Sequence, residues 1–309
     1  MFYRGLIIFA LHYLIFMTRI KGELSKILII VTFLQTALTV AGCNNKRGAV
    51  ISQTDTSNDV NLVSDVDSVS IKEKNDSSLR YIYLTFDDGP QHGTMTCYHI
   101  CRDLNVKASF FMVGVHADNN HLKSWADSIK RNYPYIFLAN HSYTHAYSNH
   151  YHKFYATRPS LAELDFVRAQ DSLHIPYKIT RFPGNCTWNL HSKPFGPKST
   201  WPLARYMDSS GFDIIGWDVE WRFKGKNSSP VESTKTMVKI VDEYMNSPKL
   251  RTPNHIVILA HDRMFAQPAA ADSLKNFILA LKQNPHIVFK TIDQYPGLKK
   301  NKSYMACGE

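Results

Sequence analysis

From Arg80 to about residue 295, short apolar runs alternate with stretches in which apolar residues recur at helical spacing. Short apolar runs between polar or turn-forming residues are typical of buried strands. The strands predicted in this way are Tyr81–Phe86, Ala108–Val113, Tyr135–Ala139, Tyr177–Thr180, Asp213–Glu220, His255–Ala260 and Ile287–Ile292. Strand and helix alternate about seven times, which indicates a parallel sheet with right-handed crossovers. We therefore expect an α/β fold built as an incomplete or distorted barrel.

Two segments carry the residues of an N-terminal capping box and so predict where helices begin. One combines Ser160 with Glu163, and the other is Ser229-Pro230-Val231-Glu232, which has Pro at the first helical position. Cys97 and Cys101 lie at the spacing of one helix face, together with apolar neighbours. We expect both cysteines in the core rather than as metal ligands.

The first residues of the chain do not fit this pattern. Arg19, Lys21 and Lys26 precede an apolar run, 27–40, and Cys43 follows Ala and Gly shortly after it. A basic start, a short apolar stretch and small residues are typical of a secretory signal. A Cys after Ala-Gly also resembles the lipobox of bacterial lipoproteins. We therefore expect a signal peptide over residues 1–43, with a lipidated Cys43 that anchors the protein in the bacterial cell envelope, in the inner or outer membrane or at the cell surface.

An uncleaved membrane anchor is the alternative for this segment, and an earlier apolar run raises the alternative that translation starts at Met17. Residues 44–79 are rich in Ser, Asp, Asn, Thr and Lys and have no aromatic residue, which predicts a flexible tether. The folded domain is then expected over residues 80–299, with a short C-terminal tail at 300–309.

The charge balance is basic, with 36 Lys and Arg residues against 26 Asp and Glu residues. Residues 1–43 hold four of the basic residues and one of the acidic ones, which leaves 32 against 25 in the rest. A positive charge suits an anionic polymer or an envelope surface. The sequence has no Arg- or Lys-rich helix, zinc finger or aromatic RNA-binding motif, so we expect no nucleic-acid partner. We also expect the protein to be a monomer. Cys186 and Cys307 could pair in an oxidising compartment, which the sequence leaves open.

Two adjacent carboxylates end the first predicted strand, in the segment Thr85-Phe86-Asp87-Asp88-Gly89-Pro90. Neighbouring like charges are costly to desolvate, so we expect a cation or a task that needs separated pKa values beside them. His141 and His145, four residues apart, follow the third predicted strand. Two His and a carboxylate are a frequent ligand set for a catalytic Zn²⁺, with a fourth position left for water. Together these residues predict a metal hydrolase.

Polar residues also end three of the other predicted strands: Arg181, Asp218 with Glu220, and His261. In parallel barrels, active sites are built on the face where the strands end. Taken alone, Arg181 is typical of a surface ion pair and His261 of a core histidine. Their convergence on the same face as the paired carboxylates favours a common site instead.

At this point the sequence resembles the polysaccharide deacetylases of carbohydrate esterase family 4, the NodB-homology domain, over about residues 80 to 295. Thr85–Pro90 is similar to the TFDDGP motif, and His141–His145 to H-[ST]-x-x-H. Three further segments resemble the remaining motifs in the family's order: Arg181–Gly184, Trp217–Trp221 and Leu259–His261. Gly184 stands where many members have Tyr, and Glu220 stands where Asp is commoner. The resemblance implies a deformed seven-stranded (β/α) barrel.

The resemblance also implies a role for each matching residue. Asp88, His141 and His145 would hold a divalent metal, Zn²⁺ with Co²⁺ or Ni²⁺ as alternatives. Asp87 would be the general base, and His261 the general acid.

Two more roles concern the residues that would tune this base and this acid. Arg181 would orient Asp87 or tune its pKa, and Asp218 or Glu220 would do the same for His261. Period-2 geometry puts Asp218 and Glu220 on one strand face, so either could reach the site. The place of Glu220, directly before the Trp of its motif, favours Glu220.

A last group of residues would contact the substrate. The backbone N–H of Gly184 would help to hold the oxyanion, and Pro183 and Leu259 belong to the same set. Trp221 is either ordinary core or a wall of the acetyl pocket that stacks on a sugar. Further candidates for a sugar groove are Asn185, Trp188 and Asn189, whereas we assign His150 and His152 to a solvated loop.

The sequence thus predicts a metal-dependent deacetylase, a hydrolase of non-peptide C–N bonds that acts on an acetylated glycan. The expected substrate is the N-acetylglucosamine unit of peptidoglycan, a surface glycan or a chitin-like chain, with release of acetate. Amide hydrolysis needs an activated water, a polarised carbonyl and a proton for the amine, which a metal, a carboxylate and an imidazole supply. An O-acetyl esterase of the acetyl-xylan type and an inactive glycan-binding lipoprotein remain as alternatives.

Overall fold

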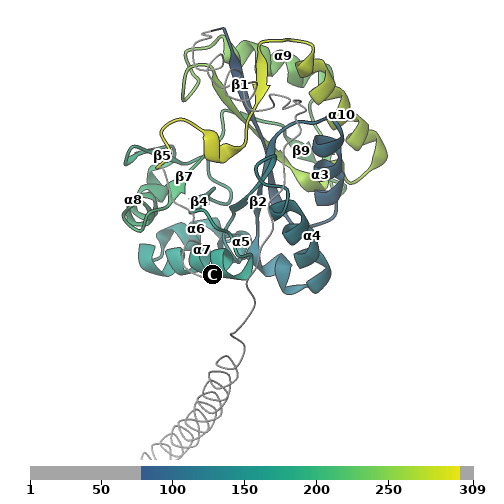
Figure 1. Ribbon diagram of the computed structural model, residues 1–309. Helices are drawn as coiled ribbons and strands as arrows, with labels where there is room; N and C mark the ends of the chain where they lie inside the picture. Colours follow the sequence, from purple (N-terminus) through teal and green to yellow (C-terminus); the bar gives the residue numbers. More distant parts are fainter. Residues whose placement is uncertain (1–77, 300–309) are drawn as a thin grey trace, which may run out of the picture. The chain divides into compact units, whose positions relative to one another are not determined.

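The computed structural model describes residues 78–299 (Figure 1). The predicted signal peptide with Cys43, most of the predicted tether, the C-terminal tail and Cys307 lie outside the described residues. Within 78–299, no helix combines the length and the apolar character that crossing a membrane requires.

A largely parallel sheet organises the fold around strand β1 (Arg80–Gly89), which is buried along most of its length. Seven strands run parallel to one another in the order β7, β4, β3, β2, β1, β11 and β8. Besides β1, their bounds are β2 (Ala108–Met112), β3 (Ile136–Asn140), β4 (Ile179–Thr180), β7 (Asp213–Ile214), β8 (Val219–Glu220) and β11 (His255–His261).

Three further strands extend this sheet without closing it. The first part of β1 also pairs with β12 (Ile287–Phe289), while β5 (Trp188–Leu190) runs antiparallel to β7 and to β6 (Lys193–Phe195). The path through the sheet ends at β6 on one side and at β8 on the other. The α/β fold with an incomplete, distorted barrel is therefore confirmed.

The prediction of one continuous strand over Asp213–Glu220 was wrong. The chain forms β7 beside β4, leaves the sheet, and then forms β8 beside β11. Gly216 lies in the break, where a Cβ atom would come 2.5 Å from Nε1 of Trp188. Only glycine fits at this position between β7 and β8, because the indole of Trp188, from another strand, fills the space.

Helices cover the sheet in two groups. Four of them follow one another along one side of the molecule in Figure 1: α9 (Thr234–Met245), α10 (Pro268–Lys282), α3 (Thr94–Asp103) and α4 (Asn120–Lys130). The others are α7 (Pro159–Ser172), which packs on α8 (Trp201–Ser209), and the short α5 (His145–Asn149) and α6 (Tyr151–Ala156).

Short 3₁₀ turns and a hairpin complete the described chain. They are η1 (Gly114–Asp118), η2 (Lys198–Thr200), η3 (Asp262–Phe265), η4 (Ile292–Gln294) and the hairpin of β9 (Phe223–Lys224) with β10 (Ser229–Pro230).

The apolar faces predicted for the helices form the core. The four residues that α10 contributes at helical spacing, from Leu274 to Leu281, are all buried. Cys97 and Cys101 are fully buried free thiols on α3, which confirms their expected place in the core. Cys186 is a free thiol within the described chain, and its pairing with Cys307 stays a prediction.

Both predicted helix starts were displaced. Helix α9 begins at Thr234 instead of after Ser229, because Ser233 caps it by accepting a hydrogen bond from the backbone N–H of Thr236. Glu232 does not act as a capping residue, since its carboxylate pairs with Arg222 at 2.6 Å. Helix α7 begins at its Pro159, whose fixed φ suits the first helical turn, and no side chain caps it.

Candidate active site

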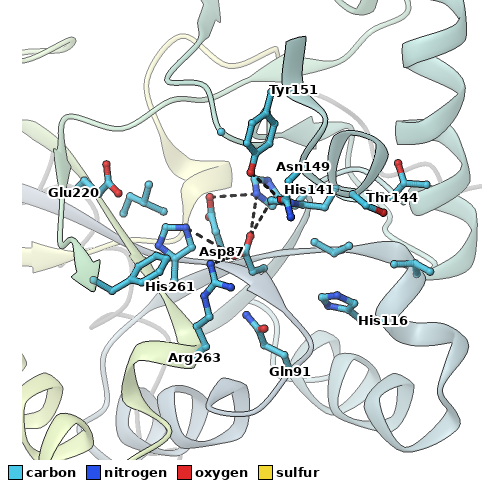
Figure 2. A pocket seen from close by; sticks show the side chains of 18 of the residues that line it. Asp87, Gln91, His116, His141, Thr144, Asn149, Tyr151, Glu220, His261 and Arg263 are labelled. Atoms are coloured by element: carbon cyan, nitrogen blue, oxygen red, sulfur yellow. Dashed lines mark hydrogen bonds and ion pairs between the residues drawn. The ribbon is translucent and has the colours of Figure 1, made fainter. Parts of the chain in front are cut away.

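A cavity of about 530 Å³ lies where the central parallel strands end (Figure 2). Its walls include the ends of β1 and β11, the loop after β3 and the short helices that follow it. The motif residues that reach it are Asp87, Asp88, His141, His145, Gly184, Glu220, Leu259 and His261. The convergence predicted for the strand ends therefore takes place at one cavity.

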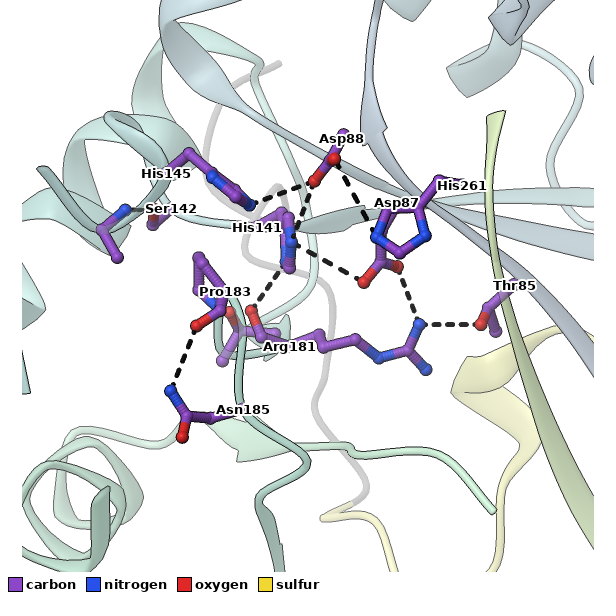
Figure 3. A network of polar contacts seen from close by, with 12 residues as sticks. Thr85, Asp87, Asp88, His141, Ser142, His145, Arg181, Pro183, Asn185 and His261 are labelled. Carbon is purple, nitrogen blue, oxygen red and sulfur yellow. Dashed lines mark hydrogen bonds and ion pairs between the residues drawn. The ribbon is translucent and has the colours of Figure 1, made fainter. Parts of the chain in front are cut away.

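A bulge in β1 lets the paired carboxylates face the same site. Regular alternation would place Asp87 and Asp88 on opposite faces of the strand. The register between β1 and β2 shifts between Asp87 and Gly89, and Asp88 has a φ of 75°. Nε2 of His141 consequently lies 3.6 Å from Oδ2 of Asp87 and 3.5 Å from Oδ1 of Asp88 (Figure 3).

His145 approaches the same carboxylate from an unusual backbone. The five residues of α5, from His145 to Asn149, all have φ between 51° and 70°, so they form a left-handed turn and not the right-handed helix that the His spacing alone suggests. This geometry costs about 1–2 kcal/mol per residue and needs support from its surroundings. Support comes from Ser142 and Thr144, whose hydroxyls accept hydrogen bonds from backbone N–H groups of the turn.

Asp88, His141 and His145 fit a divalent cation. One ligand atom from each lies within 4.8 Å of the others, and among residues 78–299 the buried Oδ1 of Asp88 has Nε2 of His145 at 3.1 Å and Nε2 of His141 at 3.5 Å as its neighbours. Nδ1 of His141 donates to the carbonyl of Arg181 at 3.0 Å, and Nδ1 of His145 donates to Oδ1 of Asn149 at 2.6 Å. With Nδ1 of each imidazole engaged in this way, Nε2 is the ring nitrogen that each histidine can offer to a metal beside Asp88, as in metal-ligating histidines.

The charge of Asp88 suits this task. Burial alone would raise the pKa of Asp88, but the neighbouring His141 and His145 hold it well below its usual range, with a contribution from His261. Arg263 also lies against this carboxylate, with Nη2 at 3.0 Å from Oδ2. The two oxygens thus have separate surroundings, since Oδ1 faces the two imidazoles and Oδ2 faces Arg263.

Arg181 holds the other carboxylate. The Arg181 side chain is fully buried, and its Nη1 lies 2.8 Å from Oδ1 of Asp87 and 2.7 Å from the hydroxyl of Thr85 (Figure 3). Its other nitrogens donate to the carbonyls of Ile215 and Gly216 at 3.3 and 2.9 Å. Arg181 is therefore fixed in one position, and it leaves Oδ2 of Asp87 open to the cavity.

His261 pairs in register with Asp87 across β1 and β11, and its Nε2 lies 3.9 Å from Oδ2 of Asp88. Burial lowers the pKa of His261, against the charge of Asp88, which raises it. Its Nδ1 is buried and has no hydrogen-bond partner among the described residues. Phe223 from the β9–β10 hairpin packs edge-on against the imidazole, with ring centroids 4.9 Å apart.

Neither predicted carboxylate forms a hydrogen bond with His261. Asp218 instead accepts hydrogen bonds from the backbone N–H groups of Arg251 at 3.1 Å and Val257 at 2.8 Å. Asp218 thus links the segment between β7 and β8, in which it lies, to the start of β11 and the residues before it. Glu220 lies at the cavity, and the two residues do not share a face because Asp218 precedes β8.

The predicted substrate residues divide into two groups. Gly184, with a φ of 65°, and Leu259 line the cavity. Pro183 lies behind it, where its carbonyl accepts a hydrogen bond from Tyr155. The interpretation of Trp221 as a cavity wall was wrong. Trp221 is fully buried, packs against Phe265 and Phe277, and donates its indole N–H to the backbone carbonyl of Glu232. Alternation along the chain turns Trp221 inward once Glu220 faces the cavity.

The sugar-groove candidates after the third motif were also mostly wrong. Trp188 and Asn189 are buried in β5, because this strand extends the sheet through β7. Asn185 is half-buried and donates to the carbonyl of Pro183 at 3.4 Å. His150 and His152 are exposed as expected, although His152 lies in α6 and not in a loop.

Several cavity residues were not assigned a role from the sequence. Thr144 and Trp217 lie within motif segments and Arg263 lies two residues after one, so their positions could have indicated them, whereas no local pattern indicates the rest. The cavity residues missed are Gln91, Val113, Val115, His116, Thr144, Ser148, Asn149, Tyr151, Trp217, Phe223 and Arg263. Tyr151 explains the unusual Gly184, since a Cβ atom there would come 2.8 Å from its ring.

A buried acid next to His261 gives a prediction about pH. Asp262 is fully buried and accepts hydrogen bonds from the Thr94 hydroxyl and from Gln91. Burial raises the pKa of Asp262 from 3.8 to about 8. The unfolded chain therefore loses this proton at a lower pH than the folded chain, so the free energy of unfolding falls as the pH rises between these values.

We expect Asp262→Asn to remove this pH dependence. Between about pH 5 and 7, the free energy of unfolding of the variant minus that of the wild type should increase by up to about 1.4 kcal/mol for each pH unit. Urea unfolding of both proteins at several pH values measures the difference. A difference that does not change with pH would mean that Asp262 is ionised in the folded protein throughout this range.

Comparison with known proteins agrees with this geometry. Residues 74–178 match the family model described as polysaccharide deacetylase. A peptidoglycan-N-acetylglucosamine deacetylase from Bacillus cereus is 26% identical over 211 residues, which are 65% of this chain and 68% of that protein.

Two solved structures resemble the fold. A CE4 esterase from Streptococcus mutans has a TM-score of 0.53 and 20% identity, over 73% of this chain and 90% of that chain. The catalytic domain of a peptidoglycan N-acetylglucosamine deacetylase from Eubacterium rectale has a TM-score of 0.50 and 23% identity, over 73% and 94% of the two chains. The family match and the curated relative thus support a hydrolase domain of the polysaccharide deacetylase type in this chain, and the two structures share its fold.

Proposed function

We propose that this protein is a metal-dependent deacetylase that removes acetyl groups from N-acetylglucosamine units of a glycan and releases acetate. The observation that carries the proposal is the pair of differently held carboxylates. Asp88 turns Oδ1 toward two imidazoles, whereas Asp87 is held by Arg181 with its other oxygen open to the cavity. One carboxylate can thus ligate a metal while its neighbour accepts a proton.

The proposed mechanism assigns one task to each residue. The chemistry supplied by a divalent cation at Asp88, His141 and His145 is Lewis acidity, which favours ionisation of water and polarises a carbonyl. Oδ2 of Asp87 accepts the proton of the attacking water. His261 then gives a proton to the departing amine nitrogen.

Two other residues complete this proposal. Arg181 orients Asp87 through the ion pair at 2.8 Å. The backbone N–H of Gly184, at the cavity wall, stabilises the developing oxyanion. Glu220 reaches the cavity without a hydrogen bond to His261, so we assign it a contact with the substrate instead of a role in proton transfer.

Acetate release from a panel of glycans tests the proposed function. The purified domain, stripped of metal and then loaded with Zn²⁺, Co²⁺ or Ni²⁺, would be assayed on N-acetylated oligosaccharides, peptidoglycan and O-acetylated xylan. We expect acetate from the N-acetylated substrates and none after chelation. Release from O-acetylated xylan alone would replace the proposal by the esterase alternative. Glycan binding without any release would favour the inactive lipoprotein.

Asn149 is expected to support the metal site from outside. Its Oδ1 accepts a hydrogen bond from Nδ1 of His145 at 2.6 Å and another from the Tyr151 hydroxyl at 2.9 Å. We expect Asn149→Ala to weaken Zn²⁺ binding about 10- to 100-fold, because loss of such a partner releases the imidazole. Asn149→Asp, which keeps the acceptor, is the matched control. Competition with a chromophoric chelator measures both, and equal affinities for the alanine variant and the wild type would contradict the role.

We further propose that residues 1–43 are a signal peptide with a lipobox that is cleaved before Cys43, that Cys43 carries lipid in the bacterial cell envelope, and that residues 44–79 tether the domain. The sequence around Cys43 supports this proposal. Cys43→Ala should abolish labelling by a radioactive fatty acid and leave an uncleaved precursor. Unchanged labelling of that variant would disprove lipidation.

A further inference from the structure

Arg263 is a cavity residue for which the proposed mechanism has no task. It follows His261 by two residues, in η3, and lies on the side of the carboxylates away from Tyr151 (Figure 2). Its side chain is 39% exposed, and its guanidinium carbon lies 4.6 Å from the ring centre of Phe223. Arginine at the wall of a glycan-sized cavity raises the question of what it binds there.

Only part of the guanidinium is used by the protein. Nη2 lies 3.0 Å from Oδ2 of Asp88, which is the sole ion-pair partner of Arg263 in residues 78–299. Its Nε is buried without a hydrogen-bond partner in the same part of the chain. Since a guanidinium carries five N–H donors, Arg263 retains donors for a further acceptor. Phe223 holds the group in place by stacking, so little conformational freedom would be lost on binding.

A second unpartnered polar group lies on the same side of the cavity. Nδ1 of His116 is buried and has no hydrogen-bond partner within the described chain. Burial lowers the pKa of His116, and the charges of Asp88 and Arg263 are close enough to act on it. An imidazole with an unpartnered Nδ1 and a guanidinium with spare donors therefore both line the cavity.

The charges in the cavity favour an anion beside Arg263. Asp87 is balanced by Arg181, and Asp88 by Arg263. A divalent cation on the proposed ligands therefore leaves this part of the cavity positive, even when the carboxylate of Glu220 on the other side of His261 is counted (Figure 2). Hydrolysis of an acetamide on a neutral sugar makes no use of the spare donors of Arg263.

We propose that Arg263 binds a carboxylate that the glycan carries next to the acetylated sugar. Acidic glycans are then better substrates than neutral chitin-like or xylan chains. The inference rests on the proposed deacetylase function and specifies its substrate class. The carboxylate could belong to a uronic acid or to the lactyl ether of muramic acid, since both offer the planar oxygen pair that a guanidinium matches.

Paired substrates that differ only in charge test the inference. N-acetylglucosamine–muramic acid oligosaccharides and N-acetylglucosamine–glucuronate oligosaccharides would each be compared with their carboxyl methyl esters, and chitotetraose serves as a neutral reference. The wild type should prefer the free acid of at least one pair, and the preferred pair identifies the source. Arg263→Gln should lower kcat/KM for that acid about 10- to 100-fold more than for its ester, mainly through KM.

Two variants serve as controls. Arg263→Lys keeps the positive charge and should retain part of the preference. Arg222→Gln removes a guanidinium that pairs with Glu232, is 66% exposed and does not line the cavity, so the preference should stay. Elemental analysis checks that the Arg263 variants keep their metal. Calorimetry on the metal-loaded Asp87→Asn protein measures binding of acid and ester without turnover.

The possible failures can be told apart. Equal kcat/KM for acid and ester in both pairs, or an equal loss on both in Arg263→Gln, would overturn the inference while acetate release still supports the deacetylase. Absence of acetate from every substrate would overturn the proposed function. In that case the calorimetric comparison tests Arg263 independently of turnover. Tighter binding of the acid than of the ester, with loss of this difference in Arg263→Gln, supports the subsite. Equal binding of acid and ester refutes it.

Discussion

Replacing His141 with alanine is expected to remove most of the bound metal and, with it, acetate release. Nε2 of His141 lies between the two carboxylates, and its Nδ1 is fixed by the carbonyl of Arg181. Loss of an outer partner of a ligand costs roughly 10- to 100-fold in metal affinity, so loss of one of three protein ligands should cost more. Elemental analysis of dialysed protein and an acetate assay measure the two losses.

His152→Ala is the matched control for this experiment. His152 is an exposed histidine on α6, a short distance along the chain from His145, and it does not line the cavity. This variant should keep both its metal and its activity. Far-UV circular dichroism of both variants separates loss of ligation from unfolding, which matters because His141 is buried. Equal metal content in folded His141→Ala and His152→Ala would rule out the assigned site.

The residues that the sequence identified best are those at the ends of strands. Asp87, His141 and His261 each follow a buried apolar run, and parallel strands deliver their ends to one edge of the sheet. The local pattern thus fixed which residues meet without any knowledge of distances. The same reasoning could not show that Asp87 and Asp88 face one site, since this depends on the bulge beside β2.

Sequence patterns did not identify the features that depend on packing between distant segments. Tyr151 reaches the cavity because a left-handed turn redirects the chain after His145, and Phe223 because a hairpin folds back over His261. The break before β8 depends on Trp188, a residue of another strand, which leaves no room for a side chain at Gly216. Such features are set by contacts between distant segments, so no periodicity within one segment reports them.

Conversion of Asp87 to asparagine is the second change from which we expect a large effect. Arg181 occupies Oδ1 of Asp87 at 2.8 Å, while Oδ2 lies 3.6 Å from Nε2 of His141 at the cavity. In Asp87→Asn, the amide oxygen satisfies Arg181, and the amide NH₂ then points to the cavity. An NH₂ group donates hydrogen bonds and cannot take a proton from water. Loss of a general base typically lowers turnover about 10²- to 10⁴-fold.

The same variant should keep its metal, because Asp87 is not one of the three proposed ligands. Elemental analysis and acetate release on one preparation therefore separate the base from the metal site, which His141→Ala removes. Glu220→Gln is the matched control, since it makes the same chemical change in another carboxylate at the cavity. We expect it to affect KM more than kcat, because Glu220 has no hydrogen bond to His261. Turnover near the wild-type level in metal-loaded Asp87→Asn would show that another group takes the proton from water.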